Sequence, residues 1–184
     1  MSKTIEMSKI ASRYARALFE KAQLQSDDTL ILEELQCILT VFNNLPELMQ
    51  FLMSPAVSYD KKQVLISTNF KDANPLVYSL LQLLLNNKRF ATLPLLVREY
   101  ETQYHLHHKI AKAELQSPLL LDDDLQVQVV EALKKTFGYH AIQISQTINP
   151  DLLGGMLIRL SDTVIDYSYR GRLKTLKKLI LQRT

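Results

Sequence analysis

The sequence predicts a mainly α-helical protein with a small α/β part at its C-terminal end. Glycine and proline, which interrupt helices, number only four and six in 184 residues. Up to about residue 105 the apolar residues recur at helical spacing, whereas from about residue 109 they alternate at a spacing of two. We therefore expect a six-helix bundle over residues 1–106, followed by a small α/β domain over residues 107–184.

Helical periodicity predicts the six helices of the first domain. The first carries an apolar face formed by Ile10, Tyr14, Ala17 and Leu18, with Ala11, Ala15 and Ala22 beside it. Helix-starting residues precede later segments, at Asp27, Pro46, Ser58, Asn74 and Pro75. The fifth helix, LVYSLLQLLLNN, is apolar nearly all round, so we expect it in the centre of the bundle. Cys37 is the only cysteine, which excludes an intrachain disulfide, and its apolar neighbours predict a small buried thiol.

The second domain begins with the segment KIAKAELQ, whose alternation predicts a strand with one buried face. Three aspartates at 122–124 favour a helix start, and Gly138 is typical of a helix end. The predicted face of that helix consists of Leu125, Val129, Ala132 and Leu133. A second alternating strand follows over residues 140–148. Then a glycine pair opens a hairpin that ends at Asp166, and a basic helix completes the chain.

That last helix carries most of the charge asymmetry. The net charge is only +3, yet six basic residues and no acidic residue lie between Arg170 and Arg183. Leu173, Leu176, Leu179 and Ile180 form its apolar side. Such a helix is typical of a solvated surface, or of an adaptor that binds an acidic partner, an anionic membrane or nucleic acid. Without interleaved aromatic residues, the nucleic-acid interpretation is the weaker one.

Motifs for catalysis and for membrane insertion are missing. The sequence has no phosphate-binding glycine loop, no dinucleotide fingerprint and no nucleophile elbow. It has no signal-peptide block and no apolar run near the roughly 20 residues that span a bilayer. His105, His107 and His108 could hold a metal, and Asp162 with Asp166 could act as an acid–base pair, which leaves a small metal-dependent enzyme as an alternative. We expect instead no catalytic residue, no metal and no cofactor.

Three segments of the chain resemble a known family, the delta subunit of bacterial F-type ATP synthase, which is related to the mitochondrial oligomycin-sensitivity-conferring protein. They are RYARALFEKA at 13–22, NNKRFATLPLLVREYETQY at 86–104 and LLGGMLIRLSDTVIDYSYRGRLKTL at 152–176. The third is the most specific. Ser161 and Tyr167 depart from it, because the family commonly has glycine at both positions.

The resemblance implies a non-catalytic stator subunit of a proton-translocating ATP synthase, present once per complex. It implies a position on the cytoplasmic face of the bacterial inner membrane, with membrane association only through the complex and no nucleic acid bound. The helical domain would bind the N-terminal helix of the alpha subunit in a groove between its first and fifth helices. The expected groove residues are Tyr14, Ala17, Leu18, Leu76, Val77 and Leu80.

The C-terminal domain would contact the b subunit of the peripheral stalk. The expected contact residues are Gly154, Gly155, Asp166, Arg170 and Arg172.

Overall fold

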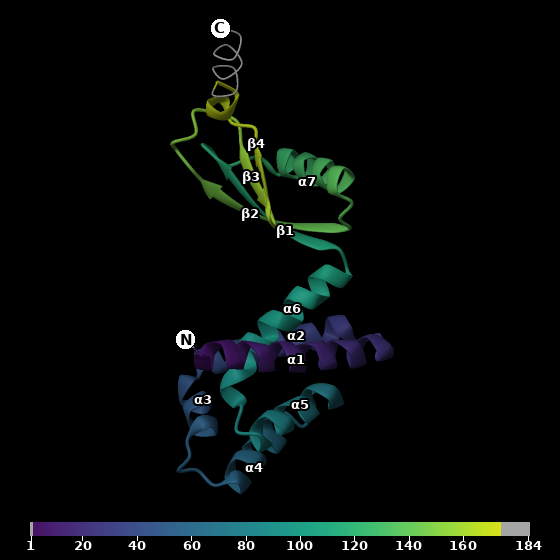
Figure 1. Cartoon of the computed structure of the whole chain (residues 1–184), viewed down its shortest axis with the longest axis vertical. Helices are drawn as coiled ribbons and strands as arrows, with labels where there is room; N and C mark the ends of the chain where they lie inside the picture. Colours follow the sequence, from purple (N-terminus) through teal and green to yellow (C-terminus); the bar gives the residue numbers. More distant parts are fainter. Residues whose placement is uncertain (1, 174–184) are drawn as a thin grey trace. The chain divides into compact units, whose positions relative to one another are not determined.

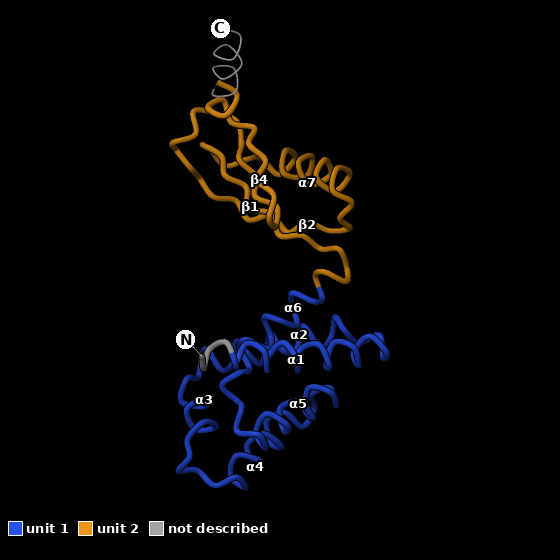
Figure 2. Tube along the Cα trace, viewed as in Figure 1, with its two compact units in different colours: residues 1–104 blue, residues 105–184 orange. Residues whose placement is uncertain are grey.

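The structure, a computed structural model, describes residues 2–173 (Figure 1). The chain divides into two compact units, residues 1–104 and residues 105–184 (Figure 2). The described residues form seven α-helices, one short 3-10 helix and a four-stranded sheet. A mainly helical protein with a small α/β part, as predicted, is therefore confirmed.

Helices make up the whole of the first unit. They are α1 (Ser2–Gln25), α2 (Asp28–Asn44), α3 (Pro46–Met53), α4 (Tyr59–Asn69), α5 (Pro75–Asn86), the 3-10 helix η1 (Phe90–Thr92) and α6 (Leu93–His107). Most starts follow the local signals. Pro46 and Pro75 open α3 and α5, and the Asn74 side chain accepts a hydrogen bond from the Leu76 amide at 2.9 Å. Asp27 and Ser58 occupy the expected N-cap positions, but neither side chain makes a cap hydrogen bond.

The predicted apolar face of α1 is only partly right. The residues that pack into the core are Ala11, Ala15, Leu18, Phe19 and Ala22, whereas Tyr14 is half-buried and Ala17 is exposed. The buried stripe is therefore centred on the alanines expected beside the face, with Phe19 added to it. On α5 the side chains of Val77, Leu81 and Leu84 are fully buried, yet Leu83 is 42% exposed. Apolar surface on these two helices thus remains outside the core.

Cys37 is exposed on α2, so the prediction of a buried thiol is wrong. Leu35 and Ile38, its apolar neighbours in the sequence, are buried. Successive residues of an α-helix are rotated by about 100°, so Cys37 points away from both. Adjacency in sequence was a poor guide here, because burial follows the helical face.

The second unit is a four-stranded sheet with one helix. Its elements are β1 (Ile110–Ser117), α7 (Asp123–Phe137), β2 (Ala141–Ile148), β3 (Leu157–Leu160) and β4 (Thr163–Asp166). The strand order is β2-β1-β3-β4, with β1 parallel to β2 and the other neighbouring pairs antiparallel. The register places the core residues on one face: Ala113 lies opposite both Ile144 and Leu160, and Leu115 lies opposite Ile158.

That inner face packs against α7, which contributes the buried Leu133 and the half-buried Val129. Leu125 and Ala132 are exposed, so half of the expected helix face is wrong. Gly138 ends the helix in a left-handed conformation (φ +73°), as predicted. The chain turns helical again at residues 169–173. The rest of the predicted basic helix, with Leu176, Leu179 and Ile180, lies outside the described residues.

Candidate protein-binding groove and glycine turn

A shallow apolar groove of about 190 Å³ lies between α1 and α5. Its lining consists of Tyr14, Ala17, Leu18 and Lys21 from α1 with Leu76, Ser79, Leu80 and Leu83 from α5. The structure thus brings together five of the six residues expected to form a groove. The sixth, Val77, is fully buried beneath it. Sequence reasoning missed Lys21, Ser79 and Leu83, although Leu83 follows Leu76 by seven residues, two helical turns along the same face.

Burial separates the floor of this groove from its walls. Leu18 and Leu80 are each 6% exposed and form the floor, where they also belong to the core. Ala17 and Leu83 are exposed, and Leu76 is half-buried. The short side chain of Ala17 allows another backbone to approach α1 closely. An exposed leucine beside an exposed alanine is typical of a surface that receives an apolar helix face.

Basic and polar groups lie at both ends of the groove. The Tyr14 hydroxyl accepts hydrogen bonds from Arg89 Nη1 at 3.2 Å and from Asn87 Nδ2 at 3.5 Å. Lys21 follows Tyr14 by seven residues, about 10 Å along the helix. None of the described residues that line the groove is acidic. The groove therefore suits a helix that carries a small apolar face with acidic residues beside it.

The glycine pair allows a close approach of two backbone segments in the second unit. A Cβ atom on Gly155 (φ +79°) would lie 2.3 Å from the Tyr167 carbonyl oxygen, and one on Gly154 would lie 2.4 Å from the Tyr169 ring. Hydrogen bonds run from the Tyr167 amide to the Met156 carbonyl at 2.9 Å and from the Tyr169 amide to the Gly154 carbonyl at 3.0 Å. Only glycine fits at position 155, because a Cβ atom there would push the two backbone segments apart.

Asp166 organises the start of the final helical turn. Its carboxylate accepts a hydrogen bond from the Ser168 amide at 2.9 Å, and the buried Ser168 hydroxyl accepts one from the Gly171 amide at 3.0 Å. A Cβ atom on Gly171 would lie 2.5 Å from the Asp166 carboxylate. Gly154, Gly155 and Asp166 therefore have roles inside the unit. Arg170 and Arg172, on the same turn, are exposed.

An apolar trough of about 360 Å³ adjoins this turn, and the sequence analysis missed it. Its lining combines Val129, Leu133 and Phe137 of α7 with Ile158 and Ile165 of the sheet. Met156 and Tyr167, which are hydrogen-bonded to each other through their backbones, complete it. Phe137 and Tyr167 are large side chains with exposed surface, so the trough offers apolar area to a partner.

The alternative acid–base pair does not assemble. Asp162 lies in the turn between β3 and β4, whereas Asp166 lies at the far end of β4, opposite Leu157. The length of a four-residue strand, about 13 Å, separates the two positions, which is too far for a shared proton. His105 and His107 belong to the last turn of α6. Within residues 2–173 no helix is long and apolar enough to cross a bilayer.

Comparison with known proteins gives one consistent family. Residues 10–180 match the family model described as ATP synthase delta (OSCP) subunit. ATP synthase subunit delta from Bacillus cytotoxicus is 31% identical over 173 residues, covering 94% of this chain and 96% of the relative. The same subunit from Latilactobacillus sakei gives the same identity and coverage.

A solved structure supports the fold. One chain of the Toxoplasma gondii mitochondrial ATP synthase hexamer superposes with a TM-score of 0.64 at 22% identity, covering 93% of this chain and 97% of that one. The match spans both units of the present chain. The chain therefore belongs to the ATP synthase delta (OSCP) family, the stator subunits that link the head of F-type ATP synthase to its peripheral stalk.

Proposed function

We propose that this chain joins the alpha–beta head to the b-subunit stalk through two separate surfaces and has no active site of its own. Helices α1–α6 act as a six-helix bundle that binds the N-terminal helix of an alpha subunit. The second unit binds the C-terminal region of the b subunit. The chain is present once per complex, and the complex alone attaches it to the cytoplasmic face of the bacterial inner membrane.

The groove between α1 and α5 is the observation that carries this proposal. Its buried floor is continuous with the core, so a bound helix would rest on a rigid base. Its exposed walls, Ala17 and Leu83, provide apolar area that binding would remove from water. Arg89 and Lys21, near opposite ends, favour an amphipathic helix with acidic flanks. A joint that must hold against rotor torque depends on slow dissociation from such a surface.

The proposed b-subunit contact combines the exposed arginines of the final turn with the adjoining trough. The glycine pair and Asp166 support this surface by holding residues 167–171 in place. Arg170 and Arg172 supply charge, whereas Phe137 and Tyr167 supply apolar area. Gly154, Gly155 and Asp166 therefore support the contact surface from within the unit.

Calorimetry with the full chain and an alpha N-terminal peptide tests the groove. Leu83→Asp should weaken binding at least about thirtyfold, because it places a charge against an apolar helix face. Leu24→Asp is the matched control, since Leu24 is also an exposed leucine, 87% accessible, on α1 outside the groove lining. Leu80 is unsuitable because it belongs to the core.

Equal affinity of the Leu83→Asp variant and the unmodified chain would remove the groove assignment, provided that circular dichroism shows both proteins folded. An equal loss in the Leu24→Asp variant would attribute the effect to charge alone. The other surface is examined in the same way. The full chain carrying both Arg170→Ala and Arg172→Ala is titrated against the soluble part of the b subunit.

A further inference from the structure

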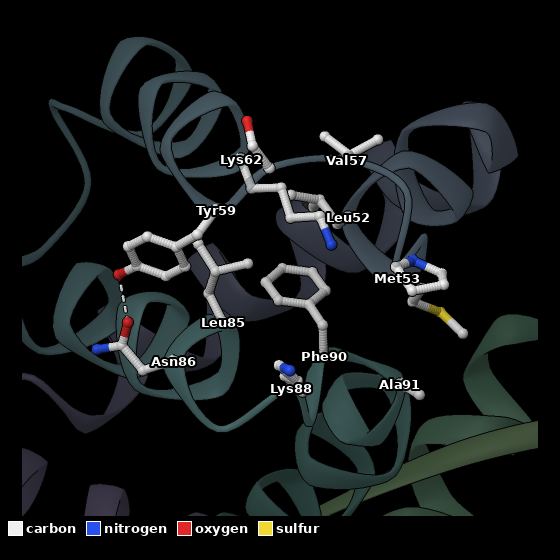
Figure 3. Close-up of a pocket in the computed structure, with 12 residues that line it drawn as sticks. Leu52, Met53, Val57, Tyr59, Lys62, Leu85, Asn86, Lys88, Phe90 and Ala91 are labelled. Atoms are coloured by element: carbon white, nitrogen blue, oxygen red, sulfur yellow. Dashed lines mark hydrogen bonds between the residues drawn. The ribbon is translucent and has the colours of Figure 1, made fainter.

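A second cavity of the first unit, with about 460 Å³ of space, has a lining separate from that of the α1–α5 groove (Figure 3). It forms where the end of α3, the connection 54–58, the start of α4, the end of α5 and η1 meet. A volume of this size is in the range of small-molecule sites. Nothing in the proposed coupling role uses this cavity.

The floor of the cavity is apolar and firmly packed. Leu52, Leu85 and Phe90 line it, and each is at most 5% exposed. The Phe90 ring packs edge-on against Phe42 in the core, with ring centroids 5.5 Å apart. The Tyr59 hydroxyl and the Asn86 side chain are hydrogen-bonded to each other and close one side (Figure 3). The floor therefore suits an apolar group of limited size, because rigid residues bound it.

Among the described residues that line the cavity, only two lysines are charged. Lys62, a lining residue, donates a hydrogen bond from Nζ to the Ser54 carbonyl oxygen at 2.6 Å, which holds its ammonium group in place (Figure 3). This bond uses one of three ammonium hydrogens. Lys88 has a left-handed backbone (φ +54°), and its amide donates a hydrogen bond to the Leu85 carbonyl oxygen at 3.0 Å. None of the described lining residues is acidic.

We propose that this cavity binds a small amphiphilic carboxylate, with the apolar chain on the Leu52–Leu85–Phe90 floor and the carboxylate between Lys62 and Lys88. A carboxylate accepts from the remaining ammonium hydrogens and balances a local charge that the lining leaves uncompensated. A fully apolar ligand would fill the floor and leave both ammonium groups without an anion. The cavity shares no lining residue with the α1–α5 groove.

Nuclear magnetic resonance of the full, isotope-labelled chain titrated with decanoate below its micelle concentration tests the proposal. Saturable shifts should map to residues 52–62 and 85–91. Decan-1-ol should bind at least about fivefold more weakly, because it lacks the charge. Lys62→Met and Lys88→Met should each weaken decanoate binding about fivefold, since methionine keeps the apolar stem and removes one cation. Ala91→Leu should block binding by filling the cavity.

Lys61→Met is the matched control, because Lys61 is an exposed lysine of the same helix that does not line the cavity. It should leave the affinity unchanged. Equal binding of decan-1-ol, an equal loss in the Lys61→Met variant, or shifts that map to the α1–α5 groove would each overturn the proposal. Lys88→Met keeps the test valid if Lys62→Met unfolds the chain through loss of the Ser54 contact, and thermal melts identify that case.

Discussion

Substitution of Gly155 by alanine should destabilise the second unit far more than the same change at Gly138. Both glycines have a left-handed backbone, with φ of +79° and +73°. At Gly138 a Cβ atom would meet no atom within 4 Å, so Gly138→Ala should cost only the left-handed strain, about 1 kcal/mol. At Gly155 the same atom would lie 2.3 Å from the Tyr167 carbonyl oxygen, so the two segments must separate.

The size of the difference follows from the hydrogen bonds that this separation disturbs. The amides of Tyr167 and Tyr169 both donate across the glycine turn, and each bond contributes about 1 kcal/mol. Gly155→Ala should therefore cost about 3 kcal/mol, about 2 kcal/mol more than Gly138→Ala. A local opening free energy smaller by about 2 kcal/mol corresponds to amide exchange about thirtyfold faster.

Native-state hydrogen exchange measured at single amides is the appropriate assay, because a chain of two compact units need not unfold in one transition. Exchange of the Tyr167 and Tyr169 amides should accelerate in the Gly155→Ala variant and stay unchanged in the Gly138→Ala variant. Equal exchange at these amides in the two variants would refute the claim that the glycine pair exists for close backbone approach.

Two further predictions concern the helical unit. Burial raises the pKa of Tyr100 above its ordinary value near 10, and repulsion from the Asp28 carboxylate adds to this effect. The free energy of unfolding should therefore stay constant below pH 10 and fall by about 1.4 kcal/mol per pH unit above it. In denaturant melts, a Tyr100→Phe variant should not show this loss of unfolding free energy at alkaline pH. An equal loss in the variant would show that Tyr100 is not its cause. Asn74→Ala should cost about 1 kcal/mol in the same melts, because it removes a cap hydrogen bond, whereas Ser58→Ala, whose side chain makes none, should cost clearly less. Equal costs would show that capping does not stabilise α5.

Local chemistry made the element boundaries predictable from the sequence. Pro46, Asn74 and Gly138 act within one turn of the chain, so their effects on helix starts and ends need no tertiary information. The same holds for β1, whose alternation directly reflects its single buried face. Sequence alone also placed the glycine pair where a hairpin opens. It did not reveal the approaching segment, residues 167–169, because that depends on the folded sheet.

Side-chain burial on the helices was less predictable. A helix that is apolar nearly all round, such as α5, does not show which side the core covers, and the exposed Leu83 was therefore overlooked. On α1, alanines are spread around the helix, so the exposed Ala17 and the buried Ala15 carry the same local signal. The prediction that Cys37 is buried was wrong for the same reason, because apolar neighbours in the sequence do not show which helical face the core covers. The groove walls could not be predicted from the sequence, because their positions depend on how one helix packs on another.

Binding of the purified full chain to both of its neighbours shows whether the chain is a linker with two separate surfaces. The chain is mixed with the alpha–beta head and with the soluble part of the b subunit, and the complexes are separated by size. We expect a ternary complex with all three components, and we expect Leu83→Asp to release the head while the b subunit stays bound. A chain that binds neither neighbour, or a Leu83→Asp variant that loses both together, would contradict a linker built from two separate surfaces.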